Sequence, residues 1–327
     1  MKKDLVSIII VNWNGKKWLK KCLDSLHSQT YNNFEIIFVD NNSQDDSVEF
    51  VEKNYPLVKI VKSDNLGFGH ACNLGTQNAK GNFLMFFNED TYVDENFVSK
   101  FINKYNLIKD KNKIGTIGCV LEDYNKKILN KKLGFGFTID WMTAPTINFD
   151  KEKIFYNTGC PLFIAKNVFN EAGGFCKNIF LFSEDLDLCW RLNLMGYKHF
   201  FLEDVYIYHY GGGVIGGYFS PKKLSYYLKG ELNCIFNNYS SLFLPFAFFY
   251  FLFFYFWLSI GYLLIGKFEY SKTINYTIIS ELRYNLKNIL AFRQIVQAKR
   301  LVSDWQLTNK INFIPSRLKN FLLFKHY

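Results

Sequence analysis

The stretch FFNEDTYVDENF, residues 86–97, begins at the end of an apolar run and passes directly into Asn88, Glu89 and Asp90. Two explanations fit so abrupt a change of character. Asn and Asp are common turn residues, so the stretch could simply reverse the chain. Alternatively, a buried strand could deliver an acidic group to a ligand held at the carboxyl end of a sheet. The rest of the sequence helps to decide between them.

The first third of the chain alternates between strand and helix patterns. Apolar runs indicate strands and apolar residues at helical spacing indicate helices, in the order strand 5–13, helix 16–29, strand 34–40, helix 46–54, strand 58–63, helix 69–81 and strand 82–88. This alternation predicts an α/β fold whose mostly parallel sheet is covered by helices on both faces. Asn12, Asp40 and Asp90 fall at predicted strand ends, where ligands of such sheets bind.

The middle of the chain has a less regular pattern. The predicted elements are loops with a hairpin at 122–156, a strand at 158–165, a helix at 182–196 and two short strands at 198–202 and 205–210. Ser183 is the predicted N-cap of the helix, and Gly196 is its predicted C-terminal stop.

The composition is that of a folded protein with reduced cysteines. Hydrophobic residues make up 49% of the 327 residues, which suffices for a large core and excludes wholesale disorder. The seven cysteines are odd in number and form no C-x-x-C pair, so neither a disulfide framework nor a zinc site is predicted. A reducing compartment is favoured. The N-terminal apolar run ends at Asn12, which indicates a first strand rather than a signal peptide.

The net charge of +10 is concentrated near the C-terminus. Residues 267–327 contain eleven Lys or Arg and three Asp or Glu, and the preceding 25 residues, 242–266, contain no charge. This run could span a bilayer, but a single crossing from the cytosol would place the basic tail outside, against the positive-inside tendency. We therefore expect a hairpin-like or interfacial insertion, with residues 283–300 along anionic headgroups and no nucleic-acid partner. The alternative is a buried helix in a homo-oligomer interface.

Asp40 ends the second predicted strand, in FVDNNSQDDS. A dinucleotide-binding domain also places an acid there, but it needs G-x-G-x-x-G after the first strand. The first turn has a single glycine, and GFGHAC at 67–72 follows the third strand, so this explanation is rejected. A turn with Ser43 or Asp46 capping the next helix is the structural alternative. It leaves Asp40 able to accept a hydrogen bond from a nucleobase.

Seven motifs occur in an ordered set across residues 5–213. They are SIIIVNWNG, FVDNNSQDDS, NLGFGHACNLG, NED, TGCPLFIAKNVFNEAGGF, FSEDLDLCWRLNLMGY and YHYGGG. In this order they resemble family 2 glycosyltransferases of the GT-A fold, and within them the bacterial rhamnosyltransferase branch of surface-polysaccharide biosynthesis. The resemblance implies a GT-A domain with a Rossmann-like, mostly parallel sheet at 1–215. A helical, membrane-associating region at 216–327 would follow it.

The resemblance also implies a donor site. Asp40 matches the base-recognising acid of the family, and Asn12 would lie near the same nucleoside. Asn65, Gly67 and Asn73, in NLGFGHACNLG, match a stretch that borders the donor sugar.

Asn88-Glu89-Asp90 occupies the metal-binding D-x-D position of the family, although Asn88 replaces the first Asp. All three are assigned to donor binding, Asp90 as the metal ligand, with a plain turn as the alternative for Glu89. His209, in YHYGGG, matches a family histidine that completes the metal site. Oxygen ligands imply Mg²⁺ or Mn²⁺, which would stabilise the leaving diphosphate.

Glu184 and Asp185 match an acidic pair at a helix N-terminus. Acids in a first helical turn also interact favourably with the helix dipole, but three of them, counting Asp187, exceed that need. We expect Asp185 to be the general base. Glu184 points about 100° away around the helix and would hold the acceptor. TGCP matches a loop on the acceptor side, which assigns Gly159 and Cys160 there.

Together the resemblance predicts an inverting, metal-dependent glycosyltransferase at the cytoplasmic face of the cell membrane. The donor implied is dTDP-L-rhamnose, with a UDP-sugar as the nearest alternative, and the acceptor is a lipid-linked or cell-surface glycan. A processive synthase would need several transmembrane helices and a Q-x-x-R-W motif, which the sequence lacks. A catalytically inactive sugar-nucleotide-binding scaffold would be expected to have lost Asp90, Asp185 or His209.

Overall fold

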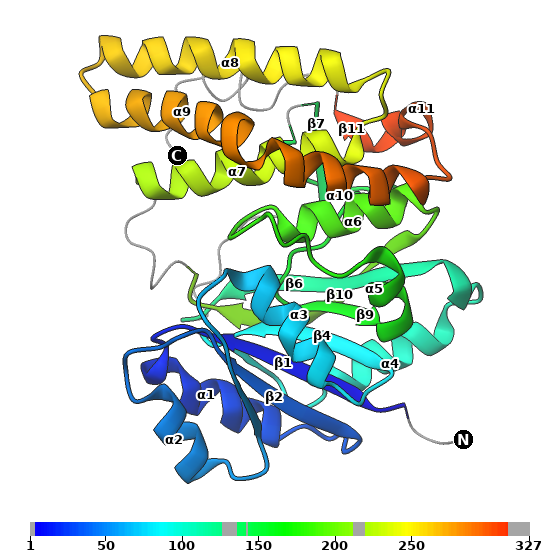
Figure 1. Ribbon diagram of the computed structural model, residues 1–327. Helices are drawn as coiled ribbons and strands as arrows, with labels where there is room; N and C mark the ends of the chain where they lie inside the picture. The colour runs from blue at the N-terminus through cyan, green and yellow to red at the C-terminus, as the bar shows by residue number, and fades with distance from the viewer. Residues whose placement is uncertain (1–3, 126–135, 142, 212–219, 313–327) are drawn as a thin grey trace.

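The computed structural model describes residues 4–125, 136–141, 143–211 and 220–312, and the first part of the chain forms one large sheet (Figure 1). Its first four strands run parallel in the spatial order β3-β2-β1-β4. The alternating elements are β1 (Val6–Asn12), α1 (Lys16–His27), β2 (Phe34–Asp40), α2 (Ser47–Asn54), β3 (Lys59–Lys62), α3 (Phe68–Asn78) and β4 (Phe83–Asn88). Each corresponds to a predicted element, so the predicted alternation is confirmed.

The parallel half forms because its central strands are apolar on both faces. All seven residues of β1 are buried, as are the last five of β2, which is typical of strands covered by helices on both sides. Because β1 pairs in register with both neighbours, Asn12 lies opposite Asp40 and Val11 lies opposite Asn88. The polar strand ends therefore meet at one edge of the sheet.

The other half of the sheet is mixed. The order continues β9-β6-β10-β5, and only β6 and β10 are parallel there. These strands are β5 (Thr91–Val93), β6 (Ile114–Asp123), β9 (Leu162–Ala165) and β10 (Lys198–His209). The α/β fold is confirmed, but the two short strands predicted at 198–202 and 205–210 are one strand. The exposed acids Glu203 and Asp204 interrupt its apolar pattern, and they lie where its pairing with β6 is irregular.

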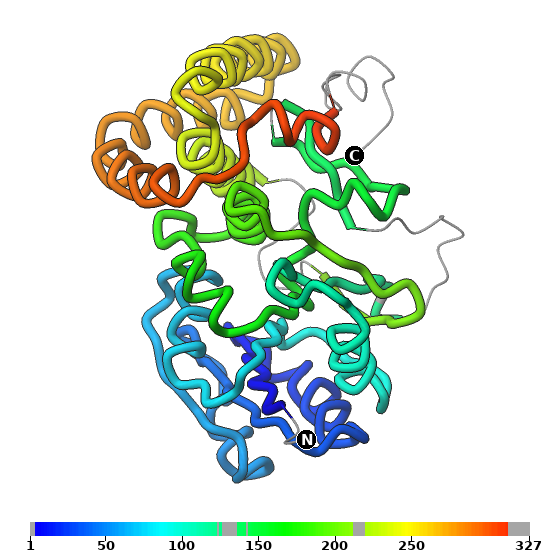
Figure 2. Tube along the Cα trace, turned by 90° about the vertical axis from the view of Figure 1, so that its right-hand side faces the viewer, coloured from blue at the N-terminus to red at the C-terminus, as the bar shows by residue number. Residues whose placement is uncertain are grey.

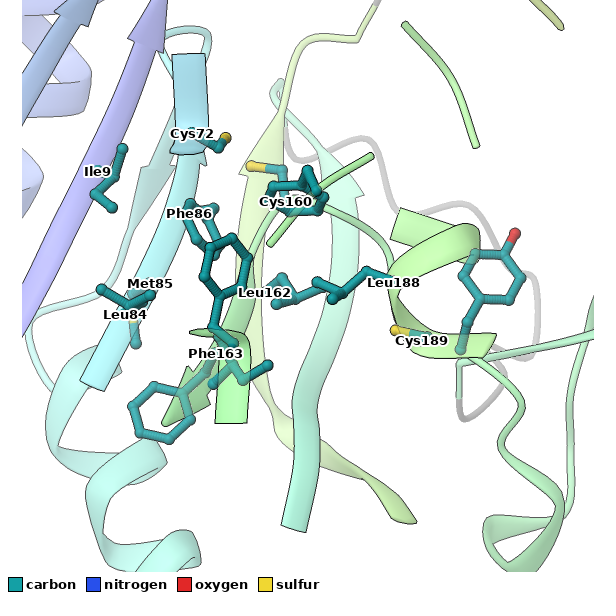
Figure 3. Packing of buried hydrophobic residues seen from close by; sticks show 14 of the residues in the cluster. Ile9, Cys72, Leu84, Met85, Phe86, Cys160, Leu162, Phe163, Leu188 and Cys189 are labelled. Atoms are coloured by element: carbon teal, nitrogen blue, oxygen red, sulfur yellow. The ribbon is translucent and has the colours of Figure 1, made fainter. Parts of the chain in front are cut away.

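Helices cover both faces of this sheet. One face carries α1, α2 and α4 (Phe97–Leu107), and the other carries α3, α5 (Lys166–Ala172) and α6 (Glu184–Leu194) (Figure 1). Figure 3 shows the core between β4, β9 and α6, where Leu162 and Leu188 point toward each other. All seven cysteines are free and buried, as expected for a chain without a disulfide framework.

Two predicted helix caps differ from the structure. Asp46 and Ser183 occupy the N-cap positions of α2 and α6, but neither side chain makes a capping hydrogen bond. Asp46 Oδ2 instead pairs with Lys16 Nζ at 2.7 Å. Ser183 has a left-handed φ of +67°, and its carbonyl accepts the N–H of Asp187. Gly196, with a φ of +86°, follows the end of α6 as predicted.

Part of the irregular segment 122–156 lies outside the described residues. Within the described part, β7 (Phe137–Asp140) and β8 (Pro145–Ile147) form the predicted hairpin. A third strand, β11 (Ile311–Asn312), pairs in parallel with β7. The last described residues of the chain therefore return to its middle.

Long helices form a separate layer beyond α6 (Figures 1 and 2). They are α7 (Pro221–Asn238), α8 (Leu244–Leu264), α9 (Phe268–Ser280), a π-helical turn (Glu281–Asn285), α10 (Leu286–Ala298) and the short α11 (Asp304–Leu307). Single 3₁₀ turns lie at Lys111–Lys113, Lys151–Lys153 and Thr308–Lys310. The apolar run 242–266 is mostly α8, the outermost helix in Figure 1. The predicted domain boundary at 215 lies outside the described residues.

A buried polar network fixes this layer to α6. Arg191 Nε donates to Asp187 Oδ2 at 2.8 Å, and its other nitrogens donate to two backbone carbonyls. Asp187 Oδ1 accepts from Asn237 and Asn238 of α7 at 3.0 and 3.1 Å. Each charge is therefore neutralised and hydrogen-bonded, as a buried ion pair requires. Asp187, the third acid of α6, is a structural link between α6 and α7.

Candidate functional site

A first polar group forms where β1 and β2 end. Asn12 Nδ2 donates to Asp40 Oδ1 at 3.1 Å and to Ser43 Oγ at 2.9 Å. The Ser43 N–H donates to Asp40 Oδ2 at 3.1 Å, so the loop after β2 closes onto both side chains. The structure thus brings the predicted Asn12 and Asp40 together. Ser43 orders their loop instead of capping α2.

Two buried acceptor atoms of this group have no hydrogen-bond partner in the protein. They are Asn12 Oδ1 and Asn41 Oδ1. The Asn41 Nδ2 donates to Asn65 Oδ1 at 3.0 Å, which joins the predicted Asn65 to the group through Asn41, the residue after Asp40. Buried polar atoms are costly without partners. A ligand that presents N–H groups would satisfy them.

A second group forms where β4 and β10 end. His209 pairs with Thr91 in the antiparallel β5–β10 ladder, and His209 Nε2 lies 2.9 Å from Asp90 Oδ1. Asn88 Nδ2 lies 3.2 Å from the same histidine nitrogen. The Gly211 N–H donates to Asp90 Oδ2 at 3.2 Å. Three predicted residues therefore meet, and Gly211 adds a contact that the sequence signalled only by the glycines after His209.

The second group fits a divalent cation that takes further ligands from elsewhere. Among the described residues, no group of three or more His, Cys, Asp or Glu side chains is arranged to hold a metal ion. Asp90 and His209 supply one carboxylate and one imidazole. The Asn88 amide oxygen becomes a third metal ligand if the side-chain amide is flipped. Hard cations commonly fill such sites with water and substrate phosphate oxygens.

Glu89 packs against the turn between β1 and α1. Its Cγ fills the space where a side chain on Gly15 would stand, and the Trp13 backbone N–H lies near its carboxylate and favours its charged form. Burial, and next the nearby Asp90, raise the pKa of Glu89 to about 8. These contacts order the backbone that follows Asn12.

A third group lies at the N-terminus of α6. Asp185 Oδ2 accepts the Gly159 N–H at 2.8 Å, and Asp185 Oδ1 accepts the Leu186 N–H at 2.7 Å. Burial raises the pKa of Asp185 despite these bonds. Glu184 is 8% exposed and its Oε2 has no partner in the protein. Burial, and next Asp185, raise the pKa of Glu184 to about 8. The backbone N–H donors of Gly159 and Leu186 favour the charged form of Asp185 and so oppose the effect of its burial.

One short loop joins the second and third groups. Gly159 donates to Asp185, and the Sγ of the next residue, Cys160, accepts the Asn88 N–H at 3.2 Å. Both predicted loop residues therefore lie between the two groups. The strand end that carries Asp90 and the helix start that carries Asp185 face the same loop.

The glycine-rich segment before α3 makes structural contacts. Gly67 has a φ of +103°, and the Phe180 carbonyl occupies the place of its missing side chain and accepts the Phe68 N–H at 3.0 Å. The Asn73 side chain bonds the backbone O and N of Phe175, both at 2.9 Å. Gly67 and Asn73 therefore hold α3 against the segment before α6, and the structure does not bring them into the three polar groups.

Glu184→Gln is expected to stabilise the protein at neutral pH. An unfolded Glu titrates near pH ~4.3, whereas the pKa of the folded Glu184 is about 8. The folded protein binds more protons in this window, so stability falls as pH rises through it. Gln removes this loss, so the melting temperature should rise by roughly 2–4 °C near neutral pH.

Thermal melts at about pH 5 and about pH 7.5 measure this effect, with the exposed Glu52→Gln on α2 as the control. The gain should be larger at the higher pH. A variant that melts like the wild type at both pH values would contradict the assigned pKa.

The family model described as glycosyl transferase family 2 matches residues 7–173, slightly more than half of the chain. The matched range contains the first polar group, and Asn88 and Asp90 of the second. It ends before His209 and the Glu184–Asp185 pair.

Curated relatives match part of the chain. An uncharacterized glycosyltransferase of Rickettsia prowazekii is 28% identical over 214 residues, which cover 63% of this chain and 61% of the relative. A dolichyl N-acetyl-α-D-glucosaminyl phosphate 3-β-D-2,3-diacetamido-2,3-dideoxy-β-D-glucuronosyltransferase of Methanococcus voltae is 25% identical over 163 residues, or 47% of this chain and 51% of the relative. The chain therefore covers less than two thirds of either protein.

Solved structures share the fold. S. aureus TarS 1–349 in complex with UDP superposes with a TM-score of 0.56 and 15% identity, over 98% of this chain and 92% of that chain. A mannosyltransferase from Pyrobaculum calidifontis in complex with GDP-Man and Mn²⁺ gives a TM-score of 0.56 and 14% identity, over 91% and 86%. These likenesses confirm the GT-A fold.

Proposed function

The chain belongs to glycosyltransferase family 2, and on that premise we propose that its three polar groups form one active site. The site would transfer a sugar, with inversion, from a nucleoside diphosphate to a hydroxyl group. The observation that carries this proposal is the loop of Gly159 and Cys160 between Asp185 and Asn88. This loop contacts both Asp185, which we propose as the base, and the strand end that would bind the metal and the diphosphate.

The first polar group would bind the nucleoside. Asp40 and the unpartnered Oδ1 atoms of Asn12 and Asn41 are hydrogen-bond acceptors, and the imide N–H of thymine or uracil is a matching donor. The donor that we propose is dTDP-L-rhamnose, on the resemblance of the ordered motifs to the rhamnosyltransferase branch. A UDP-sugar is the alternative, and UDP is the nucleotide in the S. aureus complex.

The second group would hold Mn²⁺ or Mg²⁺ through Asp90 and His209. When bound, such an ion supplies positive charge that stabilises the leaving diphosphate. The P. calidifontis structure, which contains Mn²⁺, supports this part of the proposal. The site also includes Asn88, whose amide contacts His209 and whose backbone N–H contacts the Cys160 loop.

The third group would activate the acceptor. Asp185 accepts the proton of the acceptor hydroxyl, and that oxygen forms a bond to the anomeric carbon while the bond from this carbon to the diphosphate breaks. Attack from the face opposite the diphosphate inverts the configuration without a covalent intermediate. Glu184, adjacent to Asp185, would hold the acceptor.

We propose a lipid-linked glycan acceptor at the cytoplasmic face of the membrane. The outward face of α8 exposes a row of large apolar side chains: Phe246, Phe249, Phe253, Phe256 and Trp257. Exposed basic side chains follow at Lys267, Lys272, Arg283 and Lys287. An apolar row beside basic residues suits an anionic lipid surface. The M. voltae relative is named for a dolichyl N-acetyl-α-D-glucosaminyl phosphate, which supports the proposal of a lipid-linked acceptor.

The inward face of α8 favours an interfacial position over a transmembrane one. Among the described helices, α8 alone is long and apolar enough to cross a membrane. However, Tyr255 Oη donates to the buried Glu231 at 2.5 Å, and Ser259 pairs with Ser271 at 2.7 Å. Crossing would separate these polar pairs in an apolar medium, where their loss is costly. We therefore propose that α8 lies along the membrane.

Binding and slow hydrolysis of a panel of dTDP-, UDP- and GDP-sugars, with and without Mn²⁺, test the proposed function. We expect one donor to bind and turn over in a metal-dependent manner. Binding of a donor without turnover of any donor, with or without metal, would overturn the transferase and leave a sugar-nucleotide-binding scaffold.

Phe249→Asp with Phe253→Asp is expected to weaken binding to phosphatidylglycerol-containing vesicles by about tenfold or more. The two rings are 71% and 53% exposed, so their replacement should change the stability of the folded protein little. At a lipid surface, each ring that becomes buried contributes roughly 1.5–3 kcal/mol to the binding free energy. Sedimentation with vesicles measures the bound fraction.

The control for the vesicle experiment is Leu57→Asp, at an apolar residue that is 91% exposed and lies far from α8 in the sequence. It should leave vesicle binding unchanged. If the double variant binds vesicles like the wild type but changes from dimer to monomer in light scattering, α8 is an oligomer interface and the membrane proposal is wrong.

A further inference from the structure

The turn before α6, residues 180–183, has an unusual backbone. Phe182 and Ser183 both have a φ of +67°, a left-handed conformation that non-glycine residues adopt reluctantly. Two such residues in succession persist only where their surroundings hold them. Glu184 and Asp185 follow at once, so whatever holds this turn also sets where the acidic pair lies.

One face of α7 packs directly on the turn. The rings of Phe182 and Tyr227 stack with centroids 4.2 Å apart and planes 2° apart, and those of Phe180 and Tyr226 stack at 4.9 Å. Gly230, one helical turn further on, permits the closest approach, since a Cβ there would lie 2.6 Å from the Phe182 carbonyl oxygen. Spacings of three and four residues place these side chains on a single helix face.

The same segment is held from the opposite side by α3. The Phe68 N–H donates to the Phe180 carbonyl at 3.0 Å, at the place left open by Gly67. On the α7 side, Cys234 Sγ contacts the Ser183 carbonyl at 3.6 Å. The turn is thus clamped between an element of the sheet domain and the first helix of the C-terminal layer.

We propose that Tyr226, Tyr227 and Gly230 of α7 are positioning residues for transfer, because they hold the 180–183 turn in its left-handed form. This inference rests on the proposed function, in which Asp185 is the base. The C-terminal layer then has two tasks. Its outer helix faces the membrane, and its inner helix places Asp185 against the Gly159 N–H.

Gly230→Ala tests the proposal with little change in composition. Ala favours a helix more than Gly does, so a purely helical effect would be stabilising, whereas the new methyl group must displace the Phe182 carbonyl. We expect kcat to fall by about tenfold or more, because small misplacements of a reacting group are costly, with donor KM within about twofold. The matched control is Gly261→Ala in α8, where nothing lies within 4 Å of the added atom.

Tyr227 gives a second pair of variants. Tyr227→Ala removes the ring that stacks on Phe182 and should reproduce the loss of kcat, whereas Tyr227→Phe keeps the stack and should restore it. Melting curves separate misplacement from unfolding. If both Gly230→Ala and Tyr227→Ala retain kcat, or lose it only in proportion to the folded fraction, the positioning role is refuted.

A crystal structure of Gly230→Ala gives a readout that does not depend on activity. We expect the 180–183 turn to move and the 2.8 Å contact between Asp185 and Gly159 to lengthen. An unmoved turn would overturn the inference even if the kcat of the variant falls. If the wild type transfers no sugar, the proposed function is refuted instead. The crystal structure distinguishes these two failures, because it does not depend on activity.

Discussion

Asp185→Asn is expected to lower kcat by about 10²- to 10⁴-fold, the usual contribution of a general base. The replacement has the same shape, and its amide oxygen can still accept the N–H of Gly159 or Leu186. The fold and donor binding should therefore be preserved. Single-turnover transfer measures the loss of catalytic rate, and calorimetric titration with donor nucleotide measures whether donor binding is preserved.

The pH dependence sharpens this test. Burial raises the pKa of Asp185, and a base must be deprotonated to act, so the rate should fall with decreasing pH at values above the ordinary range for an Asp. A variant that keeps more than about a tenth of the wild-type kcat would show that Asp185 is not the base. Glu184 would then be the candidate, because its Oε2 is buried without a partner in the protein.

The parallel half of the fold was predictable because it follows from local patterns. Strands buried on both faces appear as unbroken apolar runs, and the turns between them are short. The mixed half was harder to predict, since the pairing of β9 with both β4 and β6 depends on contacts between residues far apart in the chain. Likewise, β10 was split in two because two exposed acids interrupt its apolar pattern.

The site was predictable where strand ends carry polar residues. Asn12 meets Asp40 because β1 and β2 pair in register, and His209 meets Asp90 because β5 turns back along β10. Of these two contacts, only the one between Asn12 and Asp40 follows from the order of the strands along the sequence. The second needs an antiparallel pairing across more than a hundred residues, and only the family resemblance had suggested it.

In the glycine-rich segment, the sequence pattern alone does not show whether a residue contacts a ligand or another part of the protein. A glycine with positive φ allows close approach of backbone to any neighbour, whether a ligand or the protein itself. Gly67 leaves room for the Phe180 carbonyl, and the Asn73 side chain forms hydrogen bonds with the Phe175 backbone. Both contacts position the segment that leads to the acidic pair.

Asp90→Ala is expected to abolish the metal dependence of donor binding and to lower kcat by about 10²- to 10³-fold, as loss of one strong charge-stabilising group does. Asp90 is the one carboxylate in direct contact with His209 among the described residues. Without it, the imidazole and the Asn88 amide carry no negative charge to attract a divalent cation. Titration of Mn²⁺ in the presence of donor nucleotide measures the loss.

Asn88→Asp should have the opposite effect on metal binding. It restores a second carboxylate at the strand end, and affinity for hard cations increases with the number of charged oxygen ligands. Asp204→Ala, which removes an exposed acid of β10, is the control. It should change neither the affinity for Mn²⁺ nor kcat. If Asp90→Ala binds donor and Mn²⁺ like the wild type, the carboxylates after β4 form only a turn. The diphosphate would then have to be neutralised by protein groups outside the second polar group.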